Sequence, residues 1–384
     1  MRITRVEPIV VNATPHTNWV FVRLDTDDGL SGVGEATLVG NEPAVVAALE
    51  TLGRALAGQD PFRIDASGWG GSADMVQVVA VSGLEQAAWD LRGKACGMPV
   101  HALLGSRRSI VPVYANINRG TRDRSPDGFA ARAAAAVAAG YLAVKCAPFD
   151  EYLPWKPERS ALDMGVRRVE AIRAALPDRV ALMVDCHWRF DVPTAIDVGT
   201  RLAPLGLFWY ECPVPEVHPA DTLEVKTRTG LRIACGELKT RPRDYTGLLM
   251  AGCADVLMPD IKFVGGIQGL LKIGALADAF GVSVAPHNPS GPVATAATLQ
   301  AAAALDALVT LEYQFAEVEW YADLVQAEFV VTRGHMTIPT APGLGIALDR
   351  AFAAKHPYQP VRPLQDPKLI QRGLMAADTF PPPP

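Results

Sequence analysis

Ionisable residues recur at nearly regular intervals through the middle of the chain, and each ends a short run of apolar and β-branched residues. Successive members of the series are 40, 26, 26, 23, 27 and 25 residues apart. An interval of about 25 residues fits one strand followed by one helix. The series comprises Lys145, Asp185, Glu211, Glu237, Asp260, His287 and Glu312.

Together with V-P-V-Y-A at residues 111–115, these runs predict eight strands in an α/β fold. Eight strand–helix units close most simply into a parallel TIM-type barrel, in which enzymes place their chemistry at the carboxyl ends of the strands. A doubly wound open sheet is the alternative, but it would collect its site at one switch point. Because nearly every strand ends in an ionisable residue, the pattern favours the barrel.

The regions on either side of the repeating units have a different pattern. Residues 1–112 combine strand-like V-F-V-R-L-D-T-D-D-G-L-S-G-V-G-E-A with helical V-S-G-L-E-Q-A-A-W-D-L-R-G-K-A, which predicts an α+β capping domain. Residues 113–327 are expected to form the barrel. Residues 328–384 are expected to complete the cap and to end in a disordered Pro-rich tail. Loops from His16 to Trp19 and from Trp69 to Met75 are expected to act as a lid.

Composition and charge narrow the class of partner. Hydrophobic residues make up 49% and charged residues 20% of the chain, as in soluble globular proteins. A formal net charge of −5 excludes a basic field for nucleic acid or anionic lipid, so a small solute is expected. The N-terminus lacks the pattern of a secretory signal, and no apolar run is long enough to span a membrane. A cytoplasmic location is expected.

The stretch V-D-C-H places two polar side chains, Asp185 and His187, two positions apart on one predicted strand face. Glu211 and Glu237 would bring two further carboxylates to the same rim. Three unpaired carboxylates would repel one another and raise their own pKa values, and a divalent cation removes that problem. Oxygen ligands of this kind suit one Mg²⁺ ion, with Mn²⁺ as an alternative.

Other strand ends carry groups that are suited to proton transfer. Asp260 and His287 end neighbouring strands, so a hydrogen bond could orient the imidazole as a general base. Lys145 could balance the carboxylates or bind a substrate carboxylate. Glu312 could hold Lys145, or it could donate to the substrate in its protonated form. Substrate contacts are expected from rim and lid residues, namely His16, Trp19, Trp188, Arg189, Asn288 and Tyr313.

Several motifs resemble the enolase superfamily in its mandelate racemase/muconate lactonizing enzyme branch, over nearly the whole chain. They are D-T-D-D-G-L-S-G-V-G-E-A, V-S-G-L-E-Q-A-A-W-D-L-R-G-K-A-C-G-M-P-V-H-A-L-L-G, M-V-D-C-H, Y-E-C-P-V, A-C-G-E, M-P-D and A-P-H-N-P-S-G-P. The resemblance implies an α+β cap, built from the N-terminal region and the C-terminal segment, on a modified (β/α)7β barrel. It implies Mg²⁺ ligands at Asp185, Glu211 and Glu237, a His287–Asp260 dyad and a homo-oligomer.

One departure within the branch bears on the reaction. Many members carry K-x-K on the second strand, whereas here Lys145 is followed at the second position by Ala147. The D-x-H arrangement is instead similar to that of acid-sugar dehydratases of the galactonate dehydratase type, which implies that His187 is a general acid. Trp188 and Arg189 differ from that pattern. An Mg²⁺-dependent dehydratase of an aldonate or aldarate is therefore expected. The alternatives are an epimerase, racemase or cycloisomerase of a related carboxylate, and a non-catalytic ligand-binding descendant.

Overall fold

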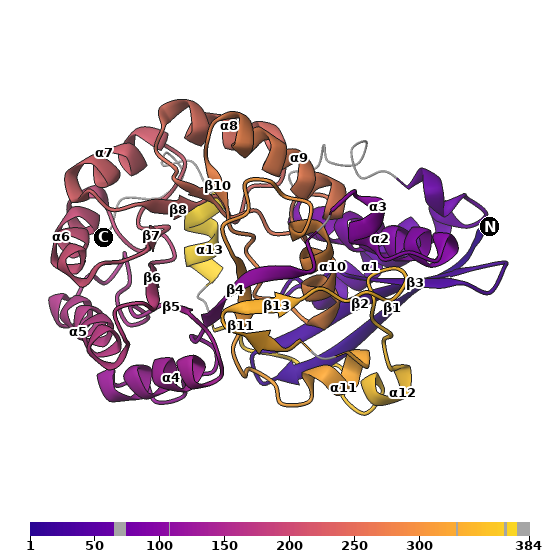
Figure 1. Cartoon of the computed structure of the whole chain (residues 1–384), viewed down its shortest axis with the longest axis horizontal. Coiled ribbons are helices and arrows are strands. Elements are labelled where there is room, and N and C mark those ends of the chain that lie inside the picture. The colour runs from indigo at the N-terminus through magenta and orange to yellow at the C-terminus, as the bar shows by residue number, and fades with distance from the viewer. Residues whose placement is uncertain (65–73, 107, 328, 365–366, 375–384) are drawn as a thin grey trace.

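The computed structural model describes residues 1–64, 74–106, 108–327, 329–364 and 367–374. Eight parallel strands form a ring, and the helices that alternate with them along the chain lie outside it (Figure 1). The ring closes where Val284 N donates to Ala307 O and Val309 N donates to Val284 O. The strands are β4 (Ile110–Asn116), β5 (Ala143–Cys146), β6 (Ala181–Asp185), β7 (Trp209–Glu211), β8 (Ile233–Cys235), β9 (Val256–Leu257), β10 (Ser283–Val284) and β11 (Leu311–Gln314).

A helix of the outer layer follows each of the first seven strands, and this confirms the predicted (β/α)7β barrel in the part of the chain that the structure describes. Several begin with proline in the first turn, where no helical N–H is lost, and two end at a left-handed glycine. The helices are α4 (Pro126–Ala138), α5 (Arg159–Ala175), α6 (Val192–Leu202), α7 (Pro219–Thr229), α8 (Pro242–Ala251), α9 (Gly266–Ala279) and α10 (Pro292–Ala302).

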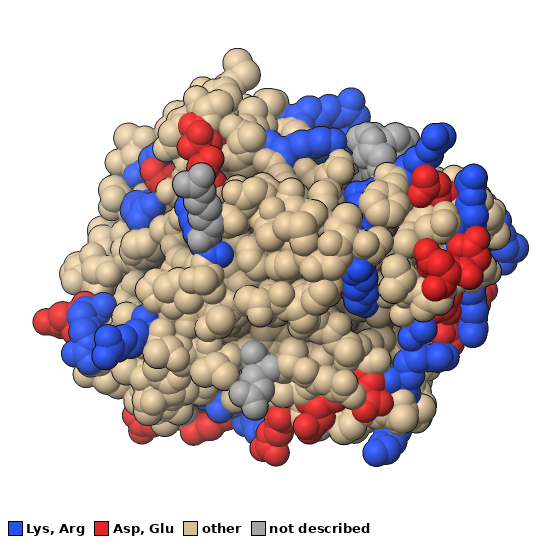
Figure 2. All heavy atoms as spheres, turned by 45° about the vertical axis from the view of Figure 1, so that its right-hand side comes forward, with Lys and Arg blue, Asp and Glu red and all other residues tan. Residues whose placement is uncertain are grey.

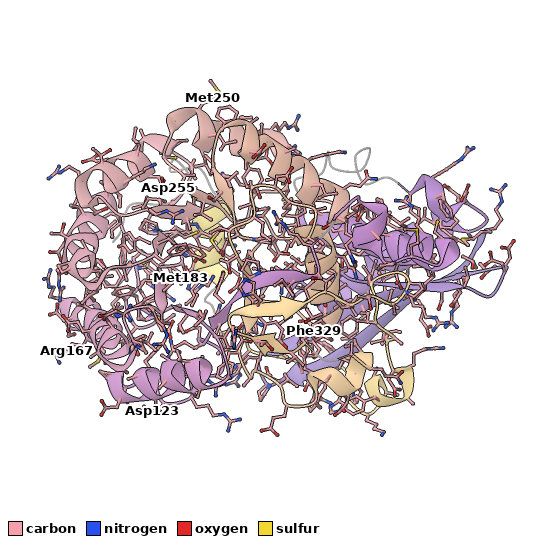
Figure 3. All side chains as sticks on the ribbon, viewed as in Figure 1. Asp123, Arg167, Met183, Met250, Asp255 and Phe329 are labelled. Carbon is pink, nitrogen blue, oxygen red and sulfur yellow. The ribbon has the colours of Figure 1, made fainter. Side chains whose placement is uncertain are left out.

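The interior of the ring is a packed core and not a pore. Figure 3 shows Met183 inside the ring and Met250 projecting outward from α8, where it is 79% exposed. The buried side chains that meet inside the ring come from different strands. They are Tyr114, Met183, Trp209, Ala234, Val256, Met258 and Ala285. This packing fixes the strands, and therefore the positions of the polar residues at their carboxyl ends.

A capping domain lies beside the barrel. Its antiparallel sheet contains β1 (Ile3–Thr14), β2 (Thr17–Thr26) and β3 (Ser31–Glu35), covered by α1 (Glu42–Leu56) and α2 (Met75–Cys96). Helix α2 approaches β3 closely, because a side chain at Gly34 would meet the carbonyl of Gly83. Short elements η1 (Pro61–Arg63) and α3 (Val100–Leu103) complete this region.

Two buried acids of the cap bind the first turns of barrel helices. Glu85 on α2 accepts from the backbone N–H groups of Ile267 and Gln268 at 2.7 and 3.1 Å, at the start of α9. Glu35, at the end of β3, accepts from Gly291 and Ala294 at 2.8 Å each, at the start of α10. A carboxylate at a helix N-terminus satisfies free N–H groups and complements the helix dipole. These contacts tie the cap to the barrel.

The C-terminal segment contacts both parts of the molecule. Strand β13 (His335–Thr337) pairs with β12 (Val331–Thr332) and runs antiparallel to β4 of the barrel. The carbonyl of Gly343 accepts from Val100 in the cap. The remaining helices are α11 (Tyr321–Val325), α12 (Arg350–Ala353) and α13 (Pro367–Leu374). The tail that was expected to be disordered falls on residues 375–384, which lie outside the described residues.

The predicted lid is only partly a loop. Residues Thr17–Trp19 begin strand β2, so only the hairpin turn at Pro15 and His16 is irregular. Most of the second predicted loop falls on residues 65–73, outside the described part, and Met75 begins helix α2. Acidic and basic side chains both lie around the face shown in Figure 2. No helix among the described residues is long and apolar enough to cross a membrane.

Candidate active site

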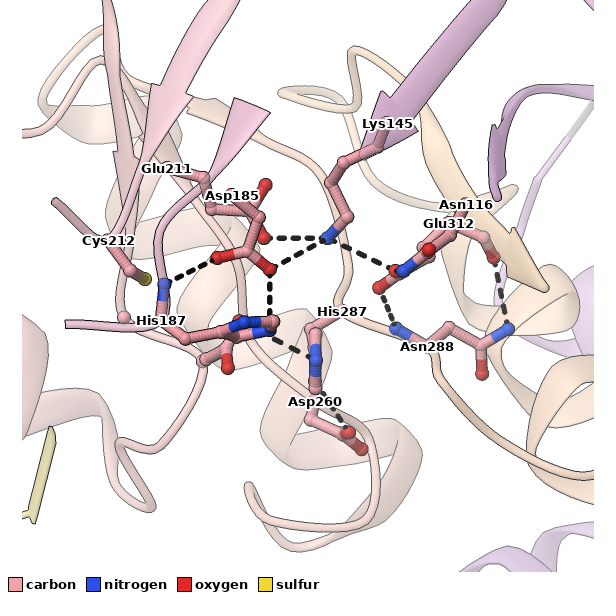
Figure 4. Close-up of polar contacts among 12 residues, drawn as sticks. Asn116, Lys145, Asp185, His187, Glu211, Cys212, Asp260, His287, Asn288 and Glu312 are labelled. Carbon is pink, nitrogen blue, oxygen red and sulfur yellow. Dashed lines mark hydrogen bonds and ion pairs between the residues drawn. The ribbon is translucent and has the colours of Figure 1, made fainter. Parts of the chain in front are cut away.

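Three carboxylates from the ends of adjacent strands meet at the carboxyl end of the barrel, and Figure 4 shows two of them, Asp185 and Glu211. Asp185 ends β6 and Glu211 ends β7, and these two residues are paired across the strands. Glu237 follows β8 by two residues. Each is buried, and each offers one oxygen so that the three oxygens lie within 4.8 Å of one another. The barrel therefore builds a compact set of oxygen ligands.

This cluster contains fewer positive than negative charges. The buried Lys145, on β5, lies with its Nζ 2.6 Å from Glu211 Oε1, 3.1 Å from Glu312 Oε1 and 4.0 Å from Asp185 Oδ2. One ammonium group thus faces four carboxylates when Glu237 is counted. Glu237 Oε2 is buried and has no hydrogen-bond partner among the described residues. A hard divalent cation fits this donor set, because it would satisfy that oxygen and balance the charge.

The pKa shifts report the same imbalance. Burial and the charge of Asp185 raise the pKa of Glu211 and of Glu237 well above the ordinary value. Burial opposes ionisation of Asp185 as well, but the neighbouring His187 and Lys145 outweigh it and lower its pKa. For Lys145, burial favours the neutral amine, yet Glu211 and Glu312 raise its pKa well above the usual range. Lys145 is therefore a fixed cation.

The predicted dyad residues lie within hydrogen-bond distance. His287 Nδ1 is 2.9 Å from Asp260 Oδ2, and its Nε2 is 3.5 Å from Glu237 Oε2. Burial raises the pKa of Asp260, but Lys262 and His287 outweigh burial and lower it. An ionised Asp260 can accept a hydrogen bond from a protonated Nδ1, which would leave Nε2 unprotonated on the side that faces Glu237.

The alternation of side chains along a strand does not explain why His187 lies beside the carboxylates. Strand β6 ends at Asp185, so a turn and not the strand pleat directs the imidazole. His187 and Trp188 both have left-handed backbones, with φ of 49° and 55°. His187 N donates to Asp185 Oδ1 and its Nε2 lies 2.9 Å from Oδ2. Its Nδ1 is buried without a hydrogen-bond partner among the described residues.

Glu312 holds neighbouring groups. Its Oε1 accepts from Asn116 Nδ2 at 2.6 Å and lies beside Lys145, while Oε2 accepts from the backbone N–H of Asn288 at 2.8 Å. Burial opposes its ionisation, but Lys145 and His287 outweigh burial and lower its pKa. Of the two roles expected for Glu312, the geometry favours the contact with Lys145 over a protonated donor to substrate.

A cavity of about 120 Å³ opens above these groups. It is lined by Lys145, Asp185, His187, Glu237 and His287, which are described above. The other lining residues come from the cap, the barrel loops and the C-terminal segment. They are His16, Thr17, Val39, Asn116, Asn118, Arg119, Pro289, Gln314, Pro363, Leu364 and Ile370.

Most of the residues that were expected to contact the substrate do not line the cavity. Trp19 is fully buried between Trp320 and Tyr321, at ring distances of 5.7 and 5.5 Å, because it lies within β2 and not in a lid loop. Tyr313 packs against Tyr321 and lines a separate hollow. Of the six residues that were expected to contact the substrate, only His16 lines the cavity.

The remaining three residues have structural partners. Asn288 is 1% exposed and donates to Thr295 Oγ1 and to the carbonyl of Glu312. Arg189 is buried, and its Nη1 donates to the carbonyl of Tyr152. Trp188 lies next to the catalytic cavity, in an adjoining hollow, and its indole N–H faces Glu216 at 3.3 Å.

The sequence pattern indicates some of the site residues that were not predicted, but it does not indicate the others. Asn116 and Gln314 are the last residues of β4 and β11, so the rule of polar strand ends would have found both. Lys262 follows Asp260 by two residues, and its Nζ lies 2.7 Å from Asp260 Oδ2. Leu364 and Ile370 belong to a segment far along the chain, and no periodicity places them over the barrel.

Comparison with known proteins agrees with the fold. Residues 128–352 match the "Enolase C-terminal domain-like" family, and residues 2–105 match the mandelate racemase/muconate lactonizing enzyme N-terminal domain. The chain is 34% identical to a D-xylonate dehydratase of Haloferax volcanii, with 92% of this chain and 88% of the other covered. Identity is 32% to a D-gluconate dehydratase of Thermoproteus tenax, covering 97% and 78%.

A D-galactonate dehydratase of Ralstonia pickettii is also 32% identical, with 87% of this chain and 90% of the other covered. Among solved structures, a mandelate racemase/muconate lactonizing enzyme from Jannaschia sp. CCS1 matches with a TM-score of 0.86 and 32% identity, over 94% of this chain and 99% of the other. These matches confirm the resemblance seen in the motifs. The chain belongs to the mandelate racemase/muconate lactonizing enzyme branch of the enolase superfamily.

Proposed function

We propose that the protein is an Mg²⁺-dependent dehydratase that converts a sugar acid into a 2-keto-3-deoxy acid. One observation carries the proposal: His187 and His287, which Asp260 contacts at 2.9 Å, line one cavity with Asp185 and Glu237, two members of the carboxylate cluster Asp185, Glu211 and Glu237. Removal of a C2 proton and loss of a C3 hydroxyl require one base and one acid, and the cavity holds one candidate for each. The names of the three relatives support an acid sugar as the substrate.

Each step uses a group that the structure places at the cavity. The substrate carboxylate would bind beside Lys145, where the ammonium group and a divalent cation held by the carboxylate cluster would together offset the negative charge of the acids. His287 Nε2 removes the C2 proton while Asp260 holds the imidazole. A divalent cation at Asp185, Glu211 and Glu237 would stabilise the negative charge that then develops on the carboxylate oxygens.

His187 completes the reaction. It donates a proton to the C3 hydroxyl, the C3–O bond breaks, and water leaves. The electron pair from the C2–H bond forms the C2–C3 double bond of an enol, and the enol converts to the 2-keto acid. The sum is substrate minus one water, with no oxidant or reductant. Ala147, directly after β5, provides no second base, which argues against racemisation by a lysine.

A screen of aldonic and aldaric acids tests the proposal. The protein with Mg²⁺ is incubated with each acid, and 2-keto acid is detected as its semicarbazone. We expect product from at least one aldonic acid and none without the metal. An epimerase or cycloisomerase would change the proton NMR spectrum of the acid without any semicarbazone. Binding of an acid without either change would favour a ligand-binding protein and would contradict the proposal.

A further inference from the structure

The end of the described chain crosses the mouth of the barrel. Residues 362–364 and 367–374, here called the C-terminal strap, run from the cap to the loop that follows β6. At the cap end, His16 Nδ1 lies 2.8 Å from the carbonyl of Arg362. At the other end, α13 lies across the ring in Figure 1, and its Ile370 lines the catalytic cavity.

The loop that the strap reaches is the one that carries His187. His187 and Trp188 are consecutive residues with φ of 49° and 55°, a conformation that residues with side chains rarely adopt. Such strained backbone persists only where surrounding contacts hold it. The turn needs external support on both sides if the imidazole is to keep one direction.

One side of the turn is held by the barrel. Trp188 N donates to the carbonyl of Cys212 at 2.7 Å, and Phe190 N donates to the carbonyl of Pro213 at 3.2 Å. These bonds fix the N–H groups of the turn to the loop after β7. They leave the carbonyl groups of Trp188 and Phe190 pointing to other partners.

The strap holds those carbonyls. Arg372 Nε donates to the carbonyl of Trp188 at 2.8 Å, and Nη2 donates to the carbonyl of Phe190 at 3.1 Å. A guanidinium is planar and presents its donors in a fixed fork, so it spans two carbonyls in a way that an ammonium cannot. The helix also packs tightly at Gly373, where a Cβ atom would lie 2.7 Å from Cδ2 of the Trp188 ring.

We propose that Arg372 is a positioning residue for His187, through which the strap sets the direction of the general acid. The inference rests on the proposed function in assigning the acid role to His187. Arg372 does not line the cavity, and it acts through the backbone of the turn. The base, His287, is held separately by Asp260, so loss of Arg372 should affect elimination more than C2-proton removal.

The test compares Arg372→Met with Gln371→Met, an exposed neighbour on the same helix, in the full chain. Deuterium uptake by backbone amides, followed by mass spectrometry, needs no substrate. We expect Arg372→Met to speed uptake at least tenfold in the peptide covering residues 186–191. Uptake around residues 256–263 should be unchanged, and Gln371→Met should match the parent protein throughout. Unchanged uptake at residues 186–191 would overturn the inference.

The second readout uses D-gluconate and D-xylonate with Mg²⁺ in deuterated water. We expect Arg372→Met to lower 2-keto acid formation at least tenfold, while deuterium still enters at C2. Arg372→Lys should recover part of the loss, since it keeps one donor. An equal loss of both steps would contradict positioning of the acid. If the parent protein makes no keto acid, the proposed function fails, whereas amide exchange still decides whether Arg372 holds the turn.

Discussion

Asp260 receives hydrogen bonds from two directions, and this determines how well it can hold the base. Lys262 donates from its backbone N–H at 2.8 Å and from Nζ to both carboxylate oxygens, while His287 occupies the other side. Lys262 is 3% exposed and also contacts Ser290. The buried ammonium group keeps Asp260 ionised and fixes its plane. Lys262 therefore supports the imidazole of His287 indirectly, through Asp260.

Replacing this ammonium group should slow chemistry more than binding. Lys262→Met keeps the length of the side chain but removes the charge and the hydrogen bonds. We expect kcat to fall about 10–100-fold with KM changed less than about threefold, the size usual for an outer-shell partner. Lys272→Met, at an exposed lysine of α9, is the matched control. A rise in KM at unchanged kcat would show that Lys262 binds substrate instead.

The acid can be separated from the base in the same way. His187→Asn should reduce dehydration by about 10²–10⁴-fold, the range for loss of a general acid, while deuterium exchange at C2 continues. Proton NMR of the sugar acid in deuterated water measures both. Mg²⁺ affinity, measured by calorimetry, should be nearly unchanged. Loss of the metal with this substitution would make His187 a ligand and contradict its role as the acid.

At the scale of elements, α2 and β3 of the cap each supply a carboxylate to a barrel helix. Glu85 binds the first turn of α9 and Glu35 binds that of α10. Helix α10 begins just after the loop that carries His287, and α9 begins just after Asp260. The cap therefore stabilises the two segments that carry the dyad. Folding of the cap and geometry of the base are linked through these contacts.

Removing one of these carboxylates should weaken the joint. Glu85→Ala leaves the N–H groups of Ile267 and Gln268 and the indole N–H of Trp89 without their acceptor. Each buried donor left unpaired costs about 1–3 kcal/mol. We expect the free energy of unfolding in urea to fall by at least about 2 kcal/mol. Glu50→Ala, at an exposed position on α1, should change it by less than about 0.5 kcal/mol. Equal effects would contradict a specific role for Glu85.

Some structural elements could be predicted from the sequence, and others could not. The spacing of polar strand ends predicted seven of the barrel strands because each strand–helix unit repeats the same geometry, and the run V-P-V-Y-A predicted the eighth. Trp19 was expected to contact the substrate from a lid loop, but it lies within β2 and does not line the cavity. The position of the C-terminal strap over the barrel could not be predicted either. Arg372 donates to the carbonyls of Trp188 and Phe190, which lie 184 and 182 positions earlier, and a local sequence pattern contains no such information.

At the scale of the whole molecule, the carboxylate cluster lies at the carboxyl end of the barrel, where adjacent strands of the ring bring the acids together. Four acids and one lysine meet there with little access to water. Without a cation, repulsion among them opposes closure of the ring. With a cation, the same carboxylates tie β6, β7 and β8 together. The metal should therefore act on stability as well as on catalysis.

Removal of the metal should make stability depend on pH in a defined direction. Burial and neighbouring charge raise the pKa of Glu211 and of Glu237 above the value of 4.5 that applies in the unfolded chain. For an acid shifted upward, the folded state binds more protons, so its stabilisation is complete below pH 4.5 and is lost as pH rises through the folded-state pKa. The metal-free protein should lose stability over that range.

Thermal unfolding with EDTA and with Mg²⁺ measures this effect. We expect EDTA to lower Tm by several degrees at pH 8, about 4 °C or more, and by less at pH 5. Glu237→Gln should lose most of the response to Mg²⁺. A shift of equal size at both pH values, or none at either, would show that protonation of these carboxylates does not compete with the metal.

The most direct test of the account is whether His287 is the base for dehydration. Parent protein and His287→Asn are each incubated with Mg²⁺ and the best sugar acid from the screen, in deuterated water. We expect only the parent protein to form 2-keto-3-deoxy acid. We expect His287→Asn to give neither this product nor deuterium at C2, while its binding of Mg²⁺ stays nearly intact. Undiminished formation of keto acid by His287→Asn would contradict the account.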